Sequence, residues 1–140
     1  MESNKGCLQF IPGSHCLDQL RGGISERRVG GAPLSRNSAI QHQVADLQSD
    51  FETVRQYAYH AAWLQSEGKL DNFTAATVKL RATELEMAAA ERFVQYQGAR
   101  GYLADSDAAR IYRDAIGGTI GGGASELMRR MIFELTRRRG

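Results

Sequence analysis

Apolar residues recur at steps of three and four over most of this chain, which is the spacing of one face of an α-helix. The clearest run covers residues 38–67 and predicts a helix of about eight turns. Its apolar seam consists of Ile40, Val44, Leu47, Phe51, Val54, Ala58, Ala61 and Leu64. Residues 68–70 then form a turn, and Asp71 or Asn72 is suited to cap a following helix.

A second long helix is predicted over residues 73–97, where Gly98 and Gly101 end it. Its apolar side is formed by Phe73, Ala76, Leu80, Met87, Ala90 and Val94. Ser106 is suited to cap a short helix that runs to about residue 114. Ala124 or Ser125 opens the last helix, whose apolar residues are Leu127, Met131, Ile132 and Leu135.

The pattern as a whole predicts an all-α fold, an antiparallel four-helix bundle over residues 26–140. Both prolines, Pro12 and Pro33, precede residue 35, and no segment reads as a strand. Residues 1–25 are poorly patterned apart from a short helical piece at residues 16–21. We expect this segment to be loosely held or to depend on a partner, and residues 26–36 to form an ordered loop.

Glycines dominate the stretch RDAIGGTIGGGASE, residues 113–126, where five of them fall within residues 117–123. Glycines in front of a helix can let backbone amides approach a phosphate, or they can form a flexible joint. The sequence pattern alone leaves both interpretations open.

Composition is ordinary for a globular domain, with 42% hydrophobic and 24% charged residues. The formal net charge of +2 is too small to argue for nucleic acid as a partner. Several arginines gather near the end of the chain: Arg129, Arg130, Arg137, Arg138 and Arg139. Such a cluster is typical of a solvated helix end that favours the negative pole of the helix dipole, with phosphate or membrane binding as the alternative.

Neither a disulfide framework nor a metal site is expected. Cys7 and Cys16 resemble free thiols of a reducing compartment, and the three histidines, His15, His42 and His60, lack ligand spacing. No apolar run reaches the roughly 18 residues of a membrane span, and the amino terminus does not resemble a secretory signal. We therefore expect the cytoplasm, or an organelle matrix, as the compartment.

No self-contained active site emerges from the residues. The glutamates lie on helix faces where charge is normally solvated, and no Glu-x-x-His pair of a di-iron bundle occurs. Three stretches remain as candidates for binding: ERRVGGAPLSRNS, QYQGARGY and the glycine-rich stretch. Together they suggest a bundle whose helix ends meet a ligand with phosphates and a planar ring.

The order of these motifs resembles the C-terminal helical domain of the acyl-CoA dehydrogenases, FAD enzymes that desaturate acyl-CoA thioesters. The resemblance covers about residues 25–137, without gaps from Lys79 onward. The matching positions are Glu26-Arg27, Gly31 to Leu34, Ile40-Gln41, Ala45 to Leu47, Lys79, Gln95, Gly98, Gly101-Tyr102, Tyr112 to Ala115 and Gly122 to Glu126. The N-terminal and middle domains of that family have no counterpart in the resemblance.

The resemblance implies that FAD lies against this domain and that a neighbouring subunit completes its site. By that likeness Arg27 reaches the FAD phosphates, and Gln95 and Gly98 approach the FAD of the adjacent subunit. Ser38, at a flavin-side position of the family, and Ala124, Ser125 and Glu126, at the start of the last helix, complete the expected cofactor residues. A guanidinium suits pyrophosphate, and small residues let amides approach it.

The departures from the family pattern concern the catalytic base and one flavin contact. Gly122 stands where one branch of the family has its glutamate base, and the helix that carries the base in another branch is not evident before Glu26. The catalytic residue is therefore unknown. Gly30 replaces an aromatic residue, and Asn37-Ser38 replaces a Phe-Gln pair, so a flavin contact is lost.

Two functions follow from these matches and departures. The first is an acyl-CoA dehydrogenase-type domain or subunit that contributes to FAD binding and oligomerisation, inactive without a partner that supplies the rest of the site. In that case acyl-CoA is the substrate of the complete enzyme, and the oligomer forms through helix faces. The alternative is a non-catalytic helical interaction protein derived from that domain.

Overall fold

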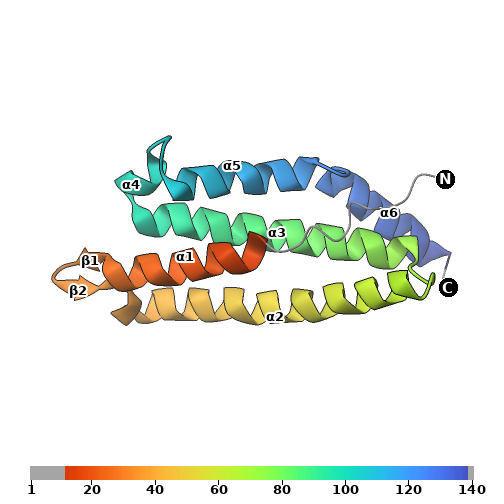
Figure 1. Ribbon diagram of the computed structural model, residues 1–140, viewed down its shortest axis with the longest axis horizontal. Helices are drawn as coiled ribbons and strands as arrows, with labels where there is room; N and C mark the ends of the chain where they lie inside the picture. The colour runs from red at the N-terminus through yellow and green to blue at the C-terminus, as the bar shows by residue number, and fades with distance from the viewer. Residues whose placement is uncertain (1–11, 139–140) are drawn as a thin grey trace.

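The computed structural model describes residues 12–138 and shows an elongated bundle of antiparallel helices (Figure 1). The elements are α1 (Pro12–Glu26), β1 (Arg28–Val29), β2 (Ala32–Pro33), η2 (Leu34–Arg36), α2 (Ser38–Ser66), α3 (Asn72–Gln97), α4 (Ala99–Tyr102), α5 (Asp107–Ile120) and α6 (Ser125–Arg137). The two long helices confirm the sequence prediction to within about a residue at each end.

α3 is the central helix of the bundle, because α1, α2, α5 and α6 all pack against it. Figure 1 shows α5 on one side of it and α1 and α2 on the other. Its buried residues are Thr74, Ala76, Val78, Leu80, Ala82, Leu85, Ala89, Ala90, Phe93 and Tyr96. Four of them are alanines, whose small side chains let neighbouring helices approach closely.

The amino-terminal part of the described chain differs from the expectation of a loosely held segment. Residues 12–26 form α1, and Cys16, Leu17, Leu20 and Ile24 belong to the main hydrophobic core. The pattern was obscured by Gly22 and Gly23, which read as a turn but lie inside the helix. Packing against α3 therefore outweighs the poor helix propensity of the two glycines. Residues 1–11 lie outside the described part.

Residues 26–36 were expected to form a loop without strands, but they contain a small hairpin. β1 pairs antiparallel with β2, with Arg28 opposite Pro33 and Val29 opposite Ala32. Gly30 and Gly31 both have positive φ, 61° and 84°, which a tight two-residue hairpin turn requires. The glycine in place of the family aromatic thus has a local reason, since it makes this turn.

The glycine-rich stretch divides into two parts. α5 continues to Ile120 rather than ending near residue 114, so Gly117 and Gly118 are helical. Gly122 and Gly123 form the turn into α6, with φ of 68° and 114°. Only the second group of glycines is therefore a joint, and Ala124 is the N-cap of α6 without a side-chain hydrogen bond.

The remaining expectations concern the cysteines, metal ligands and membrane spans. Cys16 is a free thiol buried in the core, whereas Cys7 lies outside the described residues. Among residues 12–138, no group of three or more His, Cys, Asp or Glu side chains is placed to hold a metal ion. Within the same range, no helix has the length and apolar character to cross a membrane.

Candidate functional site

The guanidinium of Arg27 lies at the carboxyl end of α3, next to Gly98, another of the expected cofactor residues. Its guanidinium donates a hydrogen bond to the carbonyl oxygen of Tyr96. A Cβ added at Gly98 would lie 2.6 Å from both terminal nitrogens of Arg27. The unpaired carbonyls at a helix end carry partial negative charge, so the cation is favourably placed there. Gly98 is thus explained by the close approach of Arg27.

Gln95 and Ser38 lie at the same end of the bundle as Arg27 and are exposed. Ser38 is the first residue of α2, and the side chain of the preceding residue, Asn37, caps that helix by accepting from the amide of Ala39 at 2.9 Å. We call Arg27, Ser38, Gln95 and Gly98 the hairpin-end cluster. The hairpin and α4 lie at this end in Figure 1. The cluster offers cationic and amide donors, which suit the oxygens of a phosphate.

The remaining expected residues, Ala124, Ser125 and Glu126, form the glycine-turn cluster at the start of α6. Ser125 is buried and Glu126 is exposed. A Cβ added at Gly122 would meet no atom within 4 Å, so the position is open although its positive φ favours glycine. The first amides of a helix lack intrahelical partners, so the turn presents donors beside a carboxylate and a hydroxyl. This set suits neutral hydroxyl and amide groups better than phosphate.

The two clusters lie far apart on the molecule. Lys79, which donates a hydrogen bond to the carbonyl of Gly123, marks the glycine-turn cluster on α3. Gly98 caps the same helix at the hairpin end. Nineteen residues separate Lys79 from Gly98, which corresponds to about 28 Å along a helix. The structure therefore brings the expected residues together in two groups, not one.

Three residues near these clusters were not among the expected cofactor residues. The hydroxyl of Tyr96 donates to Oε1 of Gln43, which joins α3 to α2 beside the carbonyl that binds Arg27. Burial raises the pKa of Tyr96. Lys79 matched the family pattern, but its neighbours in the sequence gave no indication of what it contacts. Its position three residues after Ala76, one turn along the predicted apolar side of the helix, was the available signal of a partly buried cation.

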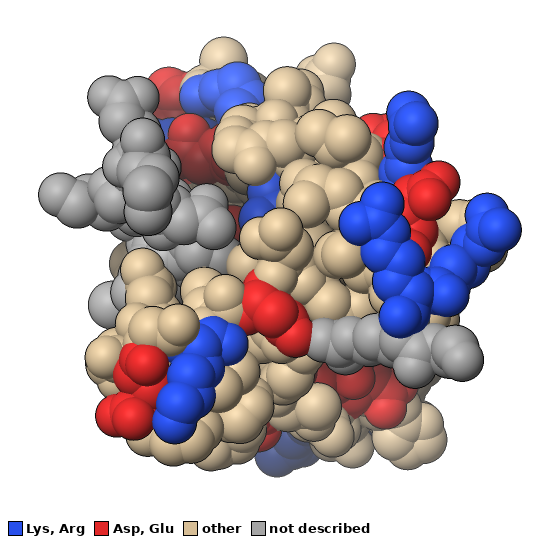
Figure 2. Space-filling model, turned by 90° about the vertical axis from the view of Figure 1, so that its right-hand side faces the viewer, with Lys and Arg blue, Asp and Glu red and all other residues tan. Residues whose placement is uncertain are grey.

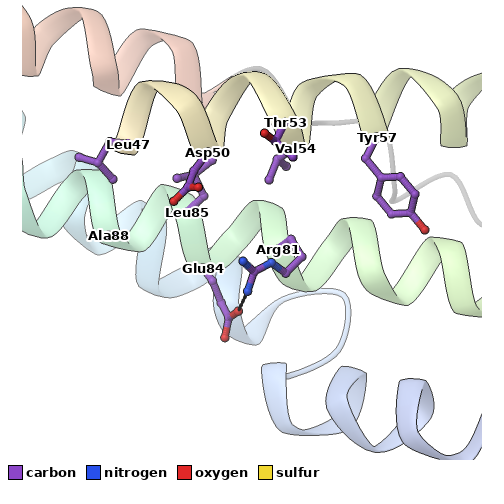
Figure 3. Close-up of a pocket in the computed structure, with 9 residues that line it drawn as sticks. All are labelled: Leu47, Asp50, Thr53, Val54, Tyr57, Arg81, Glu84, Leu85 and Ala88. Atoms are coloured by element: carbon purple, nitrogen blue, oxygen red, sulfur yellow. Dashed lines mark ion pairs between the residues drawn. The ribbon is translucent and has the colours of Figure 1, made fainter. Parts of the chain in front are cut away.

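A groove of about 290 Å³ lies elsewhere, between α2 and α3 (Figure 3). Its floor is apolar, and its charged residues are Asp50, Arg81 and Glu84, of which Arg81 and Glu84 form an ion pair at 3.6 Å. None of the expected cofactor residues lines this groove. It therefore gives no support to the expected cofactor positions.

The arginines of α6 are exposed at the end of the bundle that carries the carboxyl terminus. Figure 2 faces this end and shows basic side chains projecting from one side of it. Arg129 pairs with Glu84 of α3, and Arg137 lies in the last turn of α6. Arg137 therefore fits a solvated helix end whose cation favours the helix dipole, whereas Arg129, near the start of α6, instead joins α6 to α3.

A group of ionisable side chains also lies between α1, α3 and α5. Burial and the nearby Asp114 raise the pKa of Glu86. Burial, with a smaller contribution from Glu86, raises the pKa of the Cys16 thiol to about 12. The thiol is therefore protonated at neutral pH and behaves as a core side chain.

The geometry defines an all-helical domain that carries two separate groups of polar residues at its helix ends. The family model described as "Acyl-CoA dehydrogenase, C-terminal domain" matches residues 7–135. The chain belongs to the acyl-CoA dehydrogenase family, and its fold is that of the family's C-terminal domain. The match begins before Glu26, so it extends further toward the amino terminus than the resemblance over about residues 25–137 indicated.

Similar proteins include several named acyl-CoA dehydrogenases. The chain is 34% identical over 116 residues to "Probable acyl-CoA dehydrogenase YngJ" of Bacillus subtilis, covering 83% of the chain and 30% of that protein. It is 36% identical over 106 residues to the human mitochondrial short-chain specific acyl-CoA dehydrogenase, covering 76% and 26%. The structure of butyryl-CoA dehydrogenase from Megasphaera elsdenii matches with a TM-score of 0.84 at 28% identity, covering 90% of this chain and 33% of that one. The chain thus spans between a quarter and a third of the length of these relatives.

Proposed function

We propose that this chain contributes to FAD binding and to oligomerisation in an acyl-CoA dehydrogenase-type enzyme that desaturates an acyl-CoA thioester. Its family membership and the chemistry of its two clusters support this function. When bound, FAD would supply the acceptor for the hydrogens removed from the α and β carbons. The matched relatives are about three times as long as the chain, and no residue of the chain is assigned as the base, so the proposed enzyme needs residues beyond this domain.

The observation that carries the proposal is the division of the expected residues into two clusters about 28 Å apart along α3. One copy cannot place both clusters on the same phosphate group. Two copies arranged side by side could each offer its hairpin-end cluster to the cofactor of the other. This arrangement agrees with the expectation that Gln95 and Gly98 approach the FAD of an adjacent subunit.

The donor sets of the two clusters fit different parts of FAD. A guanidinium carries five N–H groups, so Arg27 can bond Tyr96 and still offer donors to a pyrophosphate. Glu126 at the glycine turn is unfavourable to a phosphate but accepts hydrogen bonds from hydroxyl or ring N–H groups. The residues present therefore fit FAD, with the phosphates at Arg27.

The test is a flavin absorption spectrum after gel filtration with added FAD. The chain is examined alone and together with an acyl-CoA dehydrogenase-like chain encoded beside it. We expect flavin to be retained in the mixture. Arg27→Met should weaken retention by about tenfold or more, the effect of losing a charged hydrogen bond. Arg28→Met is the matched control, because Arg28 is exposed and, among residues 12–138, its guanidinium bonds its own hairpin at Gly31.

Absence of flavin from both samples would contradict the proposal. A stable complex without flavin would favour the alternative, a non-catalytic interaction protein. Two observations support that alternative: Gly30 makes the hairpin turn and Asn37 caps α2, at positions where the family has flavin-side residues. Circular dichroism of each variant checks that the helices are retained.

A further inference from the structure

Lys79 is the residue that joins the central helix to the glycine turn. It lies on α3 between the buried Val78 and Leu80 and is itself partly exposed. Its ammonium donates to the carbonyl oxygen of Gly123, 44 residues later in the chain. This contact fixes one particular peptide group of the turn.

That peptide group determines where a backbone donor points. The peptide bond between Gly123 and Ala124 is planar and trans, so its carbonyl and its N–H point in opposite directions. A carbonyl of Gly123 held toward α3 therefore directs the N–H of Ala124 away from α3. Gly122 and Gly123 both have positive φ and could otherwise adopt many conformations, since glycine is the least restricted residue.

The start of α6 lacks the side-chain N-cap hydrogen bond that three other helices have. The side chains of Asn37, Asp71 and Ser106 accept hydrogen bonds from the first turns of α2, α3 and α5. The N-cap of α6 is Ala124, which makes no such bond. At α6, the hydrogen bond from Lys79 to the carbonyl of Gly123 takes the place of a local side-chain cap.

The body of α6 is held independently of Lys79. Met128 packs with Ala76 and Leu80 in a second apolar cluster, and Arg129 pairs with Glu84. Burial lowers the pKa of Lys79, and the carboxylate of Glu126 opposes that change. Placing the ammonium of Lys79 at the turn therefore costs part of its hydration. Met128 and Arg129 already attach α6 to α3, so the attachment alone does not require this contact.

We propose that Lys79 is a positioning residue of the cofactor site, which orients the first amides of α6 by holding the carbonyl of Gly123. The role in cofactor binding rests on the proposed function, whereas the effect on the turn does not. Any group bound at the glycine turn then meets donors whose direction is set before binding.

The first test measures backbone amide order parameters by NMR in the chain alone. Lys79→Met should lower the order parameters of residues 123–126 from about 0.85, the value of rigid backbone, toward about 0.6, the value of flexible backbone. The order parameters at the carboxyl end of α3 should not change. Lys69→Met is the matched control, because Lys69 is exposed in the turn before α3 and pairs with Glu67 at 3.7 Å.

The melting temperature separates positioning from a purely structural role. Because Met128 and Arg129 hold the body of α6 without Lys79, Lys79→Met should leave the melting temperature nearly unchanged while it loosens the turn. Lys79→Arg, which keeps a charged donor, should restore the order parameters of the turn. Unchanged order parameters in Lys79→Met, or a lower melting temperature with lower order parameters throughout, would overturn the proposal. If that variant does not fold, Lys79→Gln is measured in the same way and judged by the same outcomes.

The second test uses the flavin-retaining mixture described above. Lys79→Met should weaken FAD retention by about tenfold, and Lys79→Arg should recover most of it. If the unaltered mixture retains no flavin, the proposed function fails, while the order parameters still decide whether Lys79 orients the turn. Full FAD retention by Lys79→Met would refute the role in cofactor binding.

Discussion

At the scale of single residues, Glu86 makes the stability of the protein depend on pH. Its carboxylate lies against α5, where a Cβ at Gly118 would be 3.6 Å from Oε2, and Asp114 is on the same helix. Burial and Asp114 raise the folded-state pKa of Glu86 above 4.5. The folded protein therefore binds more protons than the unfolded chain above pH 4.5, so this residue's contribution to stability falls as pH rises through the raised pKa.

Glu86→Gln should raise the melting temperature at pH 7, because the amide resembles the protonated carboxyl and never ionises. The gain should shrink as pH falls to about 3.5, one unit below the ordinary pKa, where the carboxyl is largely protonated in both states. Melting curves at the two pH values measure the difference. Glu91→Gln, at an exposed position of the same helix, is the control, with an expected change within about 0.5 kcal/mol. An equal gain at both pH values would contradict the prediction.

Gly98 and Gly22 should respond to alanine in opposite directions. Gly98 has a φ of 62° and faces Arg27, so Gly98→Ala should destabilise the fold by about 1–3 kcal/mol. Gly22 lies exposed in α1 with no atom within 4 Å of an added Cβ, so Gly22→Ala should stabilise it by about 0.5–1 kcal/mol. Urea unfolding measures both. Similar effects in the two variants would mean that the contact with Arg27 does not constrain Gly98.

At the scale of elements, α1 is part of the core although its sequence resembles a turn-rich segment. Leu20 is 0% exposed, so Leu20→Ala should lower the free energy of unfolding by about 2–5 kcal/mol. Gln19→Ala, at the neighbouring exposed position, should change it by less than about 0.5 kcal/mol. A small effect of Leu20→Ala would show that α1 does not support the fold in solution.

The elements that the sequence predicted well are those whose patterns are strong and long. α2 and α3 have uninterrupted apolar periodicity and recognisable caps at Asn37 and Asp71, so local rules sufficed. α1 and the second half of α5 contain pairs of glycines, which local rules read as breaks. Their helices persist because tertiary packing stabilises them, and packing cannot be seen in a local pattern.

At the scale of the whole molecule, the residues of the candidate site could be named from the sequence, but their grouping could not. The resemblance identified Arg27, Gln95 and Glu126 one by one along the chain. Their division into two clusters depends on the direction and length of α3, around which the other helices pack. The contacts of Arg27 and Lys79 with backbone carbonyls were also hidden, because a carbonyl acceptor has no signature in a sequence.

The continuity of α3 has a consequence for how the length of this protein can vary. A residue inserted between Lys79 and Gly98 would shift one cluster relative to the other by about 1.5 Å and rotate it by about 100°. The same insertion in the turn between α2 and α3 would leave both clusters where they are. Chains that keep both clusters in use should therefore differ in length at their turns, while the spacing from Lys79 to Gly98 stays constant.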